Sequence, residues 1–229
     1  MPMTARDFLS GALADTISRL FNLSAATAYE HIFLQRTSRS VFGDLCTPAP
    51  LRLSSTVVNS PPSEIADRIS SSIQLDERFV NSEVYRRKGF LNFCMSRSYM
   101  LSVLSRLSEF SPEPLRKYQG ENQITQSCAA ILKHAAMRGI VPDTGLLRGY
   151  SPHQDENTLL RLVVLCHDDL LSDDPKTFKR NSLTRTVEAY SRFYKKYPIL
   201  TEDALTTVFR LALTSAVWLL CSSFKEHRS

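Results

Sequence analysis

A short basic segment followed by an aromatic residue and an amide is the part of this chain best suited to binding chemistry. Arg86, Arg87 and Lys88 precede Phe90 and Asn92. RNA outside duplexes is recognised by stacking its bases on aromatic or guanidinium planes, by hydrogen bonds to base edges and by cations near the phosphates. On one strand Phe90 and Asn92 share a face, so the ring could support a base and the amide could read it. The segment therefore predicts an RNA-binding site.

The alternative is that Phe90 and Phe93 are core residues and that the basic segment is the solvated turn of a hairpin. Composition does not decide between the two interpretations, because a net charge of +5 is modest and does not by itself distinguish a nucleic-acid binder from a basic soluble protein.

A second concentration of positive charge lies between residues 176 and 196, where Glu188 is the single acid. An acidic cluster at residues 168–174 precedes it, so the chain segregates its charges. At helical spacing, Leu183, Val187, Tyr190, Tyr194 and Tyr197 form one apolar stripe, with basic residues opposite. We expect phosphate contacts from this region, with an ordinary solvated helix face as the alternative. Its basic residues are Lys176, Lys179, Arg180, Arg185, Arg192, Lys195 and Lys196, of which all but Lys176 are candidate RNA ligands.

Other candidate sites are weak. His167, Asp168 and Asp169 could suggest a metal site or a general base, but no second histidine lies at ligand spacing. The end of a helix capped by these side chains is the favoured interpretation. The sequence has no Gly-x-Ser-x-Gly elbow or phosphate-binding glycine loop. We therefore predict neither a catalytic residue nor a metal, cofactor or small-molecule site.

The five cysteines are scattered without a Cys-x-x-Cys pair, which favours reduced, buried thiols over disulfides or zinc. The first residues include an acid and lead into no cleavable apolar segment, so we expect a cytoplasmic protein. The longest apolar stretch, residues 211–221, is shorter than the roughly 20 residues of a membrane-spanning helix. A buried helix is expected there.

Hydrophobic periodicity predicts an α+β domain at residues 1–107, a linker at 108–121 and an all-α helical bundle at 122–229. The first domain is expected to contain a helix from Phe8 to about Asn22, a strand at residues 31–35 and two further helices, of which one begins after Pro61. Two strands at residues 80–85 and 90–94, joined by a turn at 86–89, and a helix at 98–107 complete it. In the second domain, helices are expected around residues 128–135, 159–165, 183–197 and 202–224, with a loop at 141–155.

Two short motifs in the first domain resemble the amino-terminal domain of arginyl-tRNA synthetases. They are Phe-Gly-Asp at residues 42–44 and Gly-Phe-Leu-Asn-Phe at residues 89–93, and their order and spacing also match. The resemblance implies a domain that binds the elbow of tRNA, with Phe90 and Asn92 facing the D-loop.

The second half resembles the helical anticodon-binding domain of the same enzymes, called DALR. The resemblance rests on residues 159–162, 191–194 and 209–213, with an entry helix at residues 128–135. The chain departs from the family at residues 123–127, where the usual Tyr-x-His-x-Arg run is replaced by Gln-Ile-Thr-Gln-Ser.

A synthetase carries its catalytic domain between two such modules, whereas this sequence has a short linker there. It contains no His-x-x-His type adenylate motif and no Lys-Met-Ser-Lys-Ser type loop. The resemblance therefore implies a non-catalytic adaptor that binds tRNA, foremost tRNA(Arg), and presents it to a catalytic protein partner. The alternatives are a protein assembly module that has lost RNA affinity and one subunit of a split tRNA-dependent enzyme.

Overall fold

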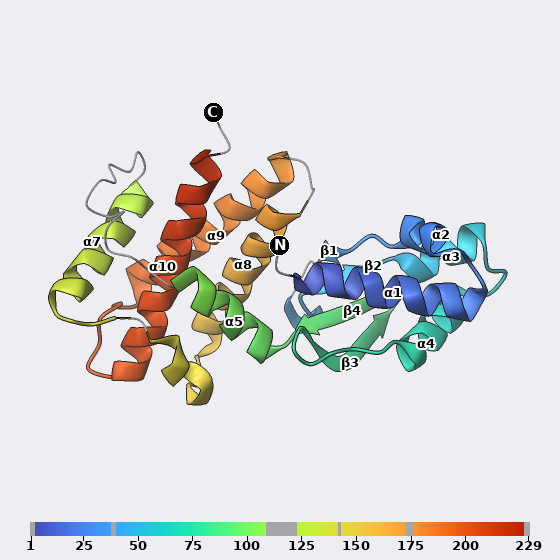
Figure 1. Ribbon diagram of the computed structural model, residues 1–229, viewed down its shortest axis with the longest axis horizontal. Coiled ribbons are helices and arrows are strands. Elements are labelled where there is room, and N and C mark those ends of the chain that lie inside the picture. The colour runs from blue at the N-terminus through green and yellow to red at the C-terminus, as the bar shows by residue number, and fades with distance from the viewer. Residues whose placement is uncertain (1–2, 38–39, 109–122, 142, 173–175, 227–229) are drawn as a thin grey trace. The chain divides into compact units, whose positions relative to one another are not determined.

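The chain forms two compact units, Met1–Tyr99 and Met100–Ser229. The computed structural model (Figure 1) describes residues 3–37, 40–108, 123–141, 143–172 and 176–226. The division between the units falls inside a helix, before the predicted domain limit at residue 107. All but Ser108 of the predicted linker lies outside the described residues, so the predicted domain limits stay a prediction.

The first unit combines helices with a small antiparallel sheet, as predicted, in the strand order β1-β2-β4-β3. Helices α3 and α4 contact strands of the sheet, and α1 packs on α4 and α2. The elements are α1 (Ala5–Phe21), α2 (Ala25–His31), β1 (Gln35–Arg36), the 3-10 helix η1 (Ser40–Phe42), β2 (Leu45–Thr47), α3 (Ala49–Thr56), α4 (Pro62–Ser72), β3 (Val80–Arg87), β4 (Phe90–Met95) and the first turn of α5 (Arg97–Ser108).

Local sequence signals set the limits of α1. The Thr4 side chain accepts a hydrogen bond from the backbone of Asp7, whose carboxylate accepts one from the backbone of Thr4, which makes a capping box. Asn22 ends the helix in the left-handed conformation at φ 52°, which asparagine tolerates better than most residues. The helix predicted to end near Asn22 is confirmed.

Strand β4 alternates between a core face and an outer face. Leu91 and Phe93 are fully buried, and Met95 is 1 % exposed. Successive strand residues point to opposite faces, so Phe90 and Asn92 lie on the other side of the sheet. The core of this unit therefore lies between the sheet and the helices that contact it, and the outer face carries the candidate site.

A buried glycine-aspartate pair fixes the start of β2 to β4. The amide of Asp44 donates to the carbonyl of Phe93 at 2.8 Å, and the Asp44 carboxylate accepts from the amide of Met95 at 2.8 Å. Gly43 has φ 103°, and a Cβ there would lie 2.7 Å from the carbonyl oxygen of Phe93. Only glycine permits both the conformation and the approach.

The β3–β4 hairpin turns on two residues, Lys88 and Gly89, whose φ angles are 49° and 78°. Positive φ at both positions is what a type I′ turn requires. The turn predicted over residues 86–89 is therefore too long, because Arg86 and Arg87 pair with Leu91 and Phe90 as the last residues of β3.

The second unit is helical, as predicted, with its longest helix surrounded by the others. That helix, α10 (Ala204–Glu226), contacts α7 (Gln123–Met137), the 3-10 helix η2 (Thr144–Gly149), α8 (Gln154–Leu171) and α9 (Lys176–Lys196). By length and composition α10 could cross a membrane, which the sequence argument from residues 211–221 missed. Most of its apolar stretch is buried within the unit, as in the core helix of a soluble protein, and the expected buried helix is confirmed.

A buried ion pair joins α8 to α10. Glu156 is fully buried, Arg210 is 6 % exposed, and Nε of Arg210 lies 2.7 Å from Oε1 of Glu156. The other carboxylate oxygen accepts from the Tyr150 hydroxyl at 2.7 Å and from the His153 amide at 3.1 Å. Nη1 of Arg210 donates to the carbonyl of Pro198 at 2.6 Å, so the guanidinium also ties down the segment after α9.

The sequence expectations for the short elements of the first unit need correction. The strand predicted at residues 31–35 is wrong, since α2 continues to His31 and β1 holds only Gln35–Arg36. Helix α2 and strand β2 were not predicted, and the second of the two expected helices was not placed at α3, because these elements are short and Pro50 interrupts the pattern of α3. Short elements owe their existence to tertiary contacts more than to local propensity.

The apolar stripe predicted for α9 is also partly wrong. Tyr190 is fully buried, but Tyr194 is 42 % exposed. The buried face includes Ser182 and Thr186 instead, and the Thr186 hydroxyl is bonded to backbone carbonyls of Ser182 and Leu162. A tyrosine ring can lie at the surface, and a threonine or serine can be buried when its hydroxyl is hydrogen-bonded. The hydrophobic pattern alone therefore predicted the wrong buried face for part of α9.

Four of the five cysteines are buried, as predicted, and Cys94 is half-buried. Burial raises the pKa of the Cys128 thiol to about 12, so this group stays protonated at neutral pH.

We expect Asp44→Ala to destabilise the first unit by about 1–3 kcal/mol, because it leaves the buried Met95 amide without its acceptor. Hydrogen exchange of the β4 amides measured by mass spectrometry should accelerate. The exposed Asp15 of α1 provides the control Asp15→Ala, which should leave exchange in β4 unchanged. Equal exchange in the Asp44 and Asp15 variants would contradict the role of the carboxylate.

We expect Arg210→Met to destabilise the second unit by about 3–5 kcal/mol, because it leaves the Glu156 charge buried without its partner. Trp218 is the single tryptophan and lies buried in α10, so its fluorescence during urea unfolding reports on this unit. The double variant Glu156→Gln/Arg210→Met should regain part of the loss. Lys196→Ala, which breaks an exposed pair, should cost less than about 1 kcal/mol.

Candidate nucleic-acid interface

The outer face of the β3–β4 hairpin brings aromatic and basic side chains together. Tyr85 is opposite Asn92, and Arg87 is opposite Phe90. Residues directly opposite each other in an antiparallel pair share a face, so these four lie on the side of the sheet away from Leu91 and Phe93. The prediction that Phe90 and Asn92 share a face is in line with this register.

Two rings and a guanidinium are accessible on this face. Tyr85 is 49 % exposed and Phe90 is half-buried. The guanidinium carbon of Arg87 lies 4.3 Å from the centre of the Phe42 ring, a cation–π contact. The Tyr85 hydroxyl donates to Glu83 at 2.8 Å, which holds the ring in place and raises the pKa of its phenol. The arrangement can stack an unpaired base and place a cation beside it.

Asn92 occupies a structural position on the same face. It is 6 % exposed, and its side-chain amide donates to the backbone carbonyl of Tyr85 at 2.9 Å. This bond links β4 to β3 next to the aromatic ring of Tyr85. That Asn92 reads a base edge stays a prediction, but its side-chain NH2 group already donates a hydrogen bond within the hairpin.

The predicted basic cluster is divided by the pleat of the strand. Arg86 points to the opposite face from Arg87, where its Nη1 lies 2.6 Å from the carboxylate of Asp67 in α4. Both partners are more than half exposed, and exposed pairs of this kind are weak, so Arg86 can exchange Asp67 for a phosphate. Lys88 is exposed at the tip of the turn.

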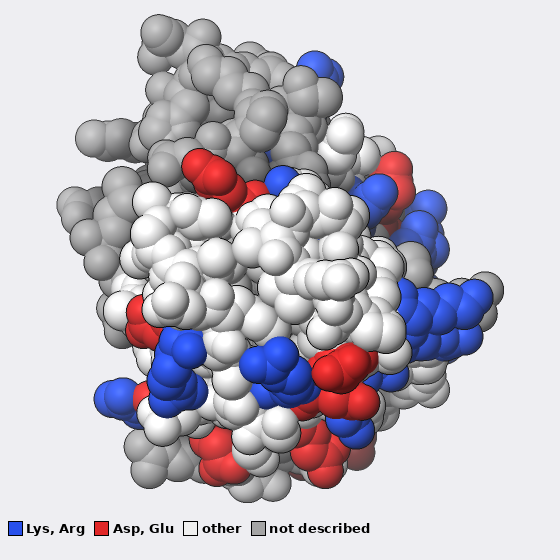
Figure 2. Space-filling model, turned by 90° about the vertical axis from the view of Figure 1, so that its right-hand side faces the viewer, with Lys and Arg blue, Asp and Glu red and all other residues white. Residues whose placement is uncertain are grey.

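The end of the first unit where α2, α3 and α4 lie carries its charges unevenly. Figure 2, which looks at this end, shows Lys and Arg bordering a broad uncharged area, with Asp and Glu among them. The electrostatic field at this end is therefore not uniformly positive. Contacts with an RNA would have to come from particular side chains such as those of the hairpin.

Sequence reasoning missed Tyr85 and Phe42 as candidate binding residues. Tyr85 could be assigned to the outer face only once the register of β3 against β4 was known, because it faces outward only if the turn has two residues. Phe42 belongs to the Phe-Gly-Asp motif at residues 42–44, yet nothing in the sequence places it under Arg87.

The basic residues predicted on α9 belong to the second unit and have different roles. Lys179 is half-buried and donates to the carbonyl of Leu170 in α8 at 3.2 Å, which ties the two helices together. Arg180, Arg185 and Lys195 are exposed. Lys176 has no described side chain.

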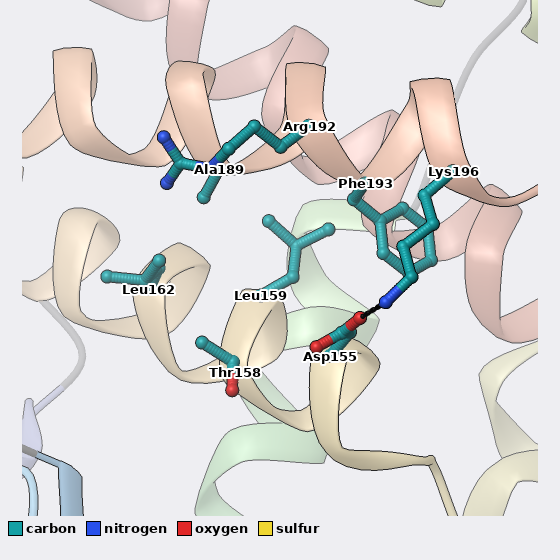
Figure 3. A pocket seen from close by; sticks show the side chains of 8 residues that line it. All are labelled: Asp155, Thr158, Leu159, Leu162, Ala189, Arg192, Phe193 and Lys196. Atoms are coloured by element: carbon teal, nitrogen blue, oxygen red, sulfur yellow. Dashed lines mark hydrogen bonds and ion pairs between the residues drawn. The ribbon is translucent and has the colours of Figure 1, made fainter.

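Arg192 and Lys196 lie at a pocket between α8 and α9 (Figure 3). Nζ of Lys196 lies 2.7 Å from the Asp155 carboxylate, which also accepts from the Tyr197 hydroxyl at 2.8 Å. These bonds lower the pKa of Asp155 and raise that of Lys196. Lys196 is therefore engaged within its own unit, whereas Arg180, Arg185 and Lys195 of the same helix are exposed.

His167 and Asp168 lie near the end of α8, with Nδ1 of His167 3.1 Å from the Asp168 carboxylate. The backbone carbonyl of Asp168 accepts the amide of Ser172, the C-cap residue. Asp168 is 3 % exposed and Asp169 is fully buried. This geometry is that of a helix end, the interpretation that the sequence favoured.

We expect Asn92→Ala to loosen the hairpin in the absence of RNA, because it removes the side-chain bond to the Tyr85 carbonyl. Hydrogen exchange in β3 and β4 of the protein without RNA should accelerate by a factor of about 3–10, the equivalent of one bond of about 1 kcal/mol. Phe90→Ala, which removes no hydrogen bond, is the matched comparison. Unchanged exchange in the Asn92 variant would mean that its amide is available for binding.

Residues 7–95 match the family model described as the arginyl tRNA synthetase N terminal domain. The matched range contains the Phe-Gly-Asp motif and the whole β3–β4 hairpin. No curated protein and no solved structure matches. The match supports a relationship between residues 7–95, which make up most of the first unit, and the amino-terminal domain of arginyl-tRNA synthetases.

Proposed function

We propose that this chain is a non-catalytic adaptor that binds tRNA through the outer face of the β3–β4 hairpin. The family match over residues 7–95 is the observation that carries the proposal. The chemistry of the hairpin supports it independently, since exposed rings and cations share one face there.

Each part of the outer face has a distinct role in the proposed complex. The rings of Tyr85 and Phe90 stack unpaired bases of the tRNA elbow, and each stacked base contributes about 1–3 kcal/mol. Arg87, held by the Phe42 ring, and Lys88 at the turn contact phosphates. A rigid hairpin with a bonded Asn92 limits the ordering cost of binding.

The proposed tRNA is tRNA(Arg), bound at the elbow by the first unit and at the anticodon arm by the second. Exposed cations of α9, including Arg180, Arg185 and Lys195, support contact with the anticodon arm. Two linked weak sites bind more tightly than either alone when both can be engaged together. The resemblance of the second unit to a DALR domain is part of this proposal.

We propose that a partner protein supplies the chemistry that acts on the bound tRNA. The 229 residues contain neither of the adenylate-forming motifs of a synthetase, while the RNA-binding segment is retained. Aminoacylation that appears only after a separate catalytic chain is added would instead identify a subunit of a split enzyme.

We expect Tyr85→Ala to weaken binding of an arginine tRNA transcript about tenfold, the loss of one stacked base. Filter binding at near-physiological salt measures it. Tyr29 of α2 is equally exposed, at 50 % against 49 %, so Tyr29→Ala is the matched control and should bind as the wild type does. Tyr85→Phe keeps the ring and should also bind normally.

Two further measurements decide the class of ligand. Lys88→Ala should reduce the slope of log affinity against log salt by roughly one, as expected for one lost phosphate contact. Arg78→Ala, which removes a cation already paired with Asp76, should change the slope less. Wild-type affinity for the arginine tRNA no greater than for an unrelated duplex RNA would refute the proposed function.

A further inference from the structure

The groove between α8 and α9 has an aliphatic floor. It contains a pocket of about 320 Å³, at the small end of the range for ligand pockets. Leu159 and Leu162 of α8 and Ala189 of α9 line it, together with Phe193 (Figure 3). The space is large enough for one apolar side chain of another molecule.

The rim of the groove carries cations in two different states. Lys196 reaches across one end and is bonded to Asp155 of α8, whereas Arg192 extends along the other end from α9 (Figure 3). Arg192 is exposed and makes no hydrogen bond or ion pair with the described residues around it. Its five donors are thus available to a carboxylate or a phosphate.

The floor does not suit an unpaired base. Phe193, the aromatic residue that lines the pocket, is 5 % exposed, so the floor offers no ring for stacking and a base could stack only on the Arg192 guanidinium at the rim. The Thr158 hydroxyl donates to the Gln154 carbonyl, so its donor is not offered to a base edge. An aliphatic floor next to a guanidinium is better suited to an apolar side chain that has an acidic residue beside it.

We propose that the α8–α9 groove docks an acidic, amphipathic segment of a partner protein. A large apolar side chain of that segment enters the pocket against Leu162 and Ala189, and a neighbouring aspartate or glutamate pairs with Arg192. The inference rests on the proposed function in one respect only, that an adaptor needs a partner protein.

Charge complementarity identifies the partner as acidic. Arg192 at the rim has no ion-pair partner among the described residues, and Glu188 is the single acid of its helix. A local excess of cations attracts an acidic segment from a distance and orients it. The pocket then selects among acidic segments by the size of the apolar side chain.

A display library of random peptides, selected on the full-length protein, tests the inference. Enriched peptides should carry a leucine, phenylalanine or other large apolar residue within a few positions of an acid. Their affinity, measured by fluorescence anisotropy, should fall about tenfold or more for Arg192→Glu, which reverses the rim charge. Ala189→Phe, which fills the pocket without changing charge, should cause a similar loss.

Arg138→Glu is the matched control, because Arg138 is an exposed arginine of the same unit outside the groove. It should change peptide affinity less than twofold. Enrichment of no such peptide, or equal losses for the Arg138 and Arg192 variants, would overturn the proposal.

The same variants separate this proposal from the RNA-binding function. If the groove docks a protein segment, Ala189→Phe binds arginine tRNA as the wild type does, while Tyr85→Ala does not. A loss of tRNA affinity in Ala189→Phe comparable to that of Tyr85→Ala would assign the groove to RNA and overturn the proposal. Loss of peptide binding with intact tRNA binding, or the reverse, shows which of the two functions fails.

Discussion

The register of β3 against β4 is the constraint on which the candidate RNA-binding face depends. It is fixed at one end by the two-residue turn, in which Lys88 and Gly89 both have positive φ, and further along by the hydrogen bond from the Asn92 side chain of β4 to the Tyr85 carbonyl of β3. Because strand side chains alternate, a slip of β3 by one residue against β4, which Asp44 holds separately, would turn Tyr85 and Arg87 toward the core face. The hydrogen bonds of the hairpin therefore decide which side chains of β3 the outer face presents.

In the second unit, the buried pair of Glu156 and Arg210 has a corresponding role. It connects the start of α8 to α10 and, through the carbonyl of Pro198, to the end of α9. Buried ion pairs add little net stability compared with apolar packing, but they penalise any arrangement that separates the charges. The pair thus favours one placement of α8 relative to α9, and that placement creates the groove.

The two surfaces differ in the chemistry that they offer, although both are rich in cations. On the hairpin, the Tyr85 ring is exposed and the guanidinium of Arg87 lies over the ring of Phe42 in η1, which suits unpaired bases. Between α8 and α9 the floor is aliphatic, and Arg192 at its rim is available to an acid. A count of basic residues would treat the two alike. What distinguishes them is whether aromatic or aliphatic side chains accompany the charge.

The sequence by itself determined the two-part organisation, most of the helices, the β3–β4 hairpin and the list of candidate cations. These follow from local information, namely hydrophobic period, proline and glycine positions and caps such as Thr4 and Asn22. Only the tertiary structure decided how each candidate is used. It placed Arg86 on Asp67, Arg87 on Phe42, Lys179 on the Leu170 carbonyl and Lys196 on Asp155. The partners come from other elements of the fold, so no local pattern could have named them. Arg210, the single base of α10 before Lys225, showed its role only beside Glu156.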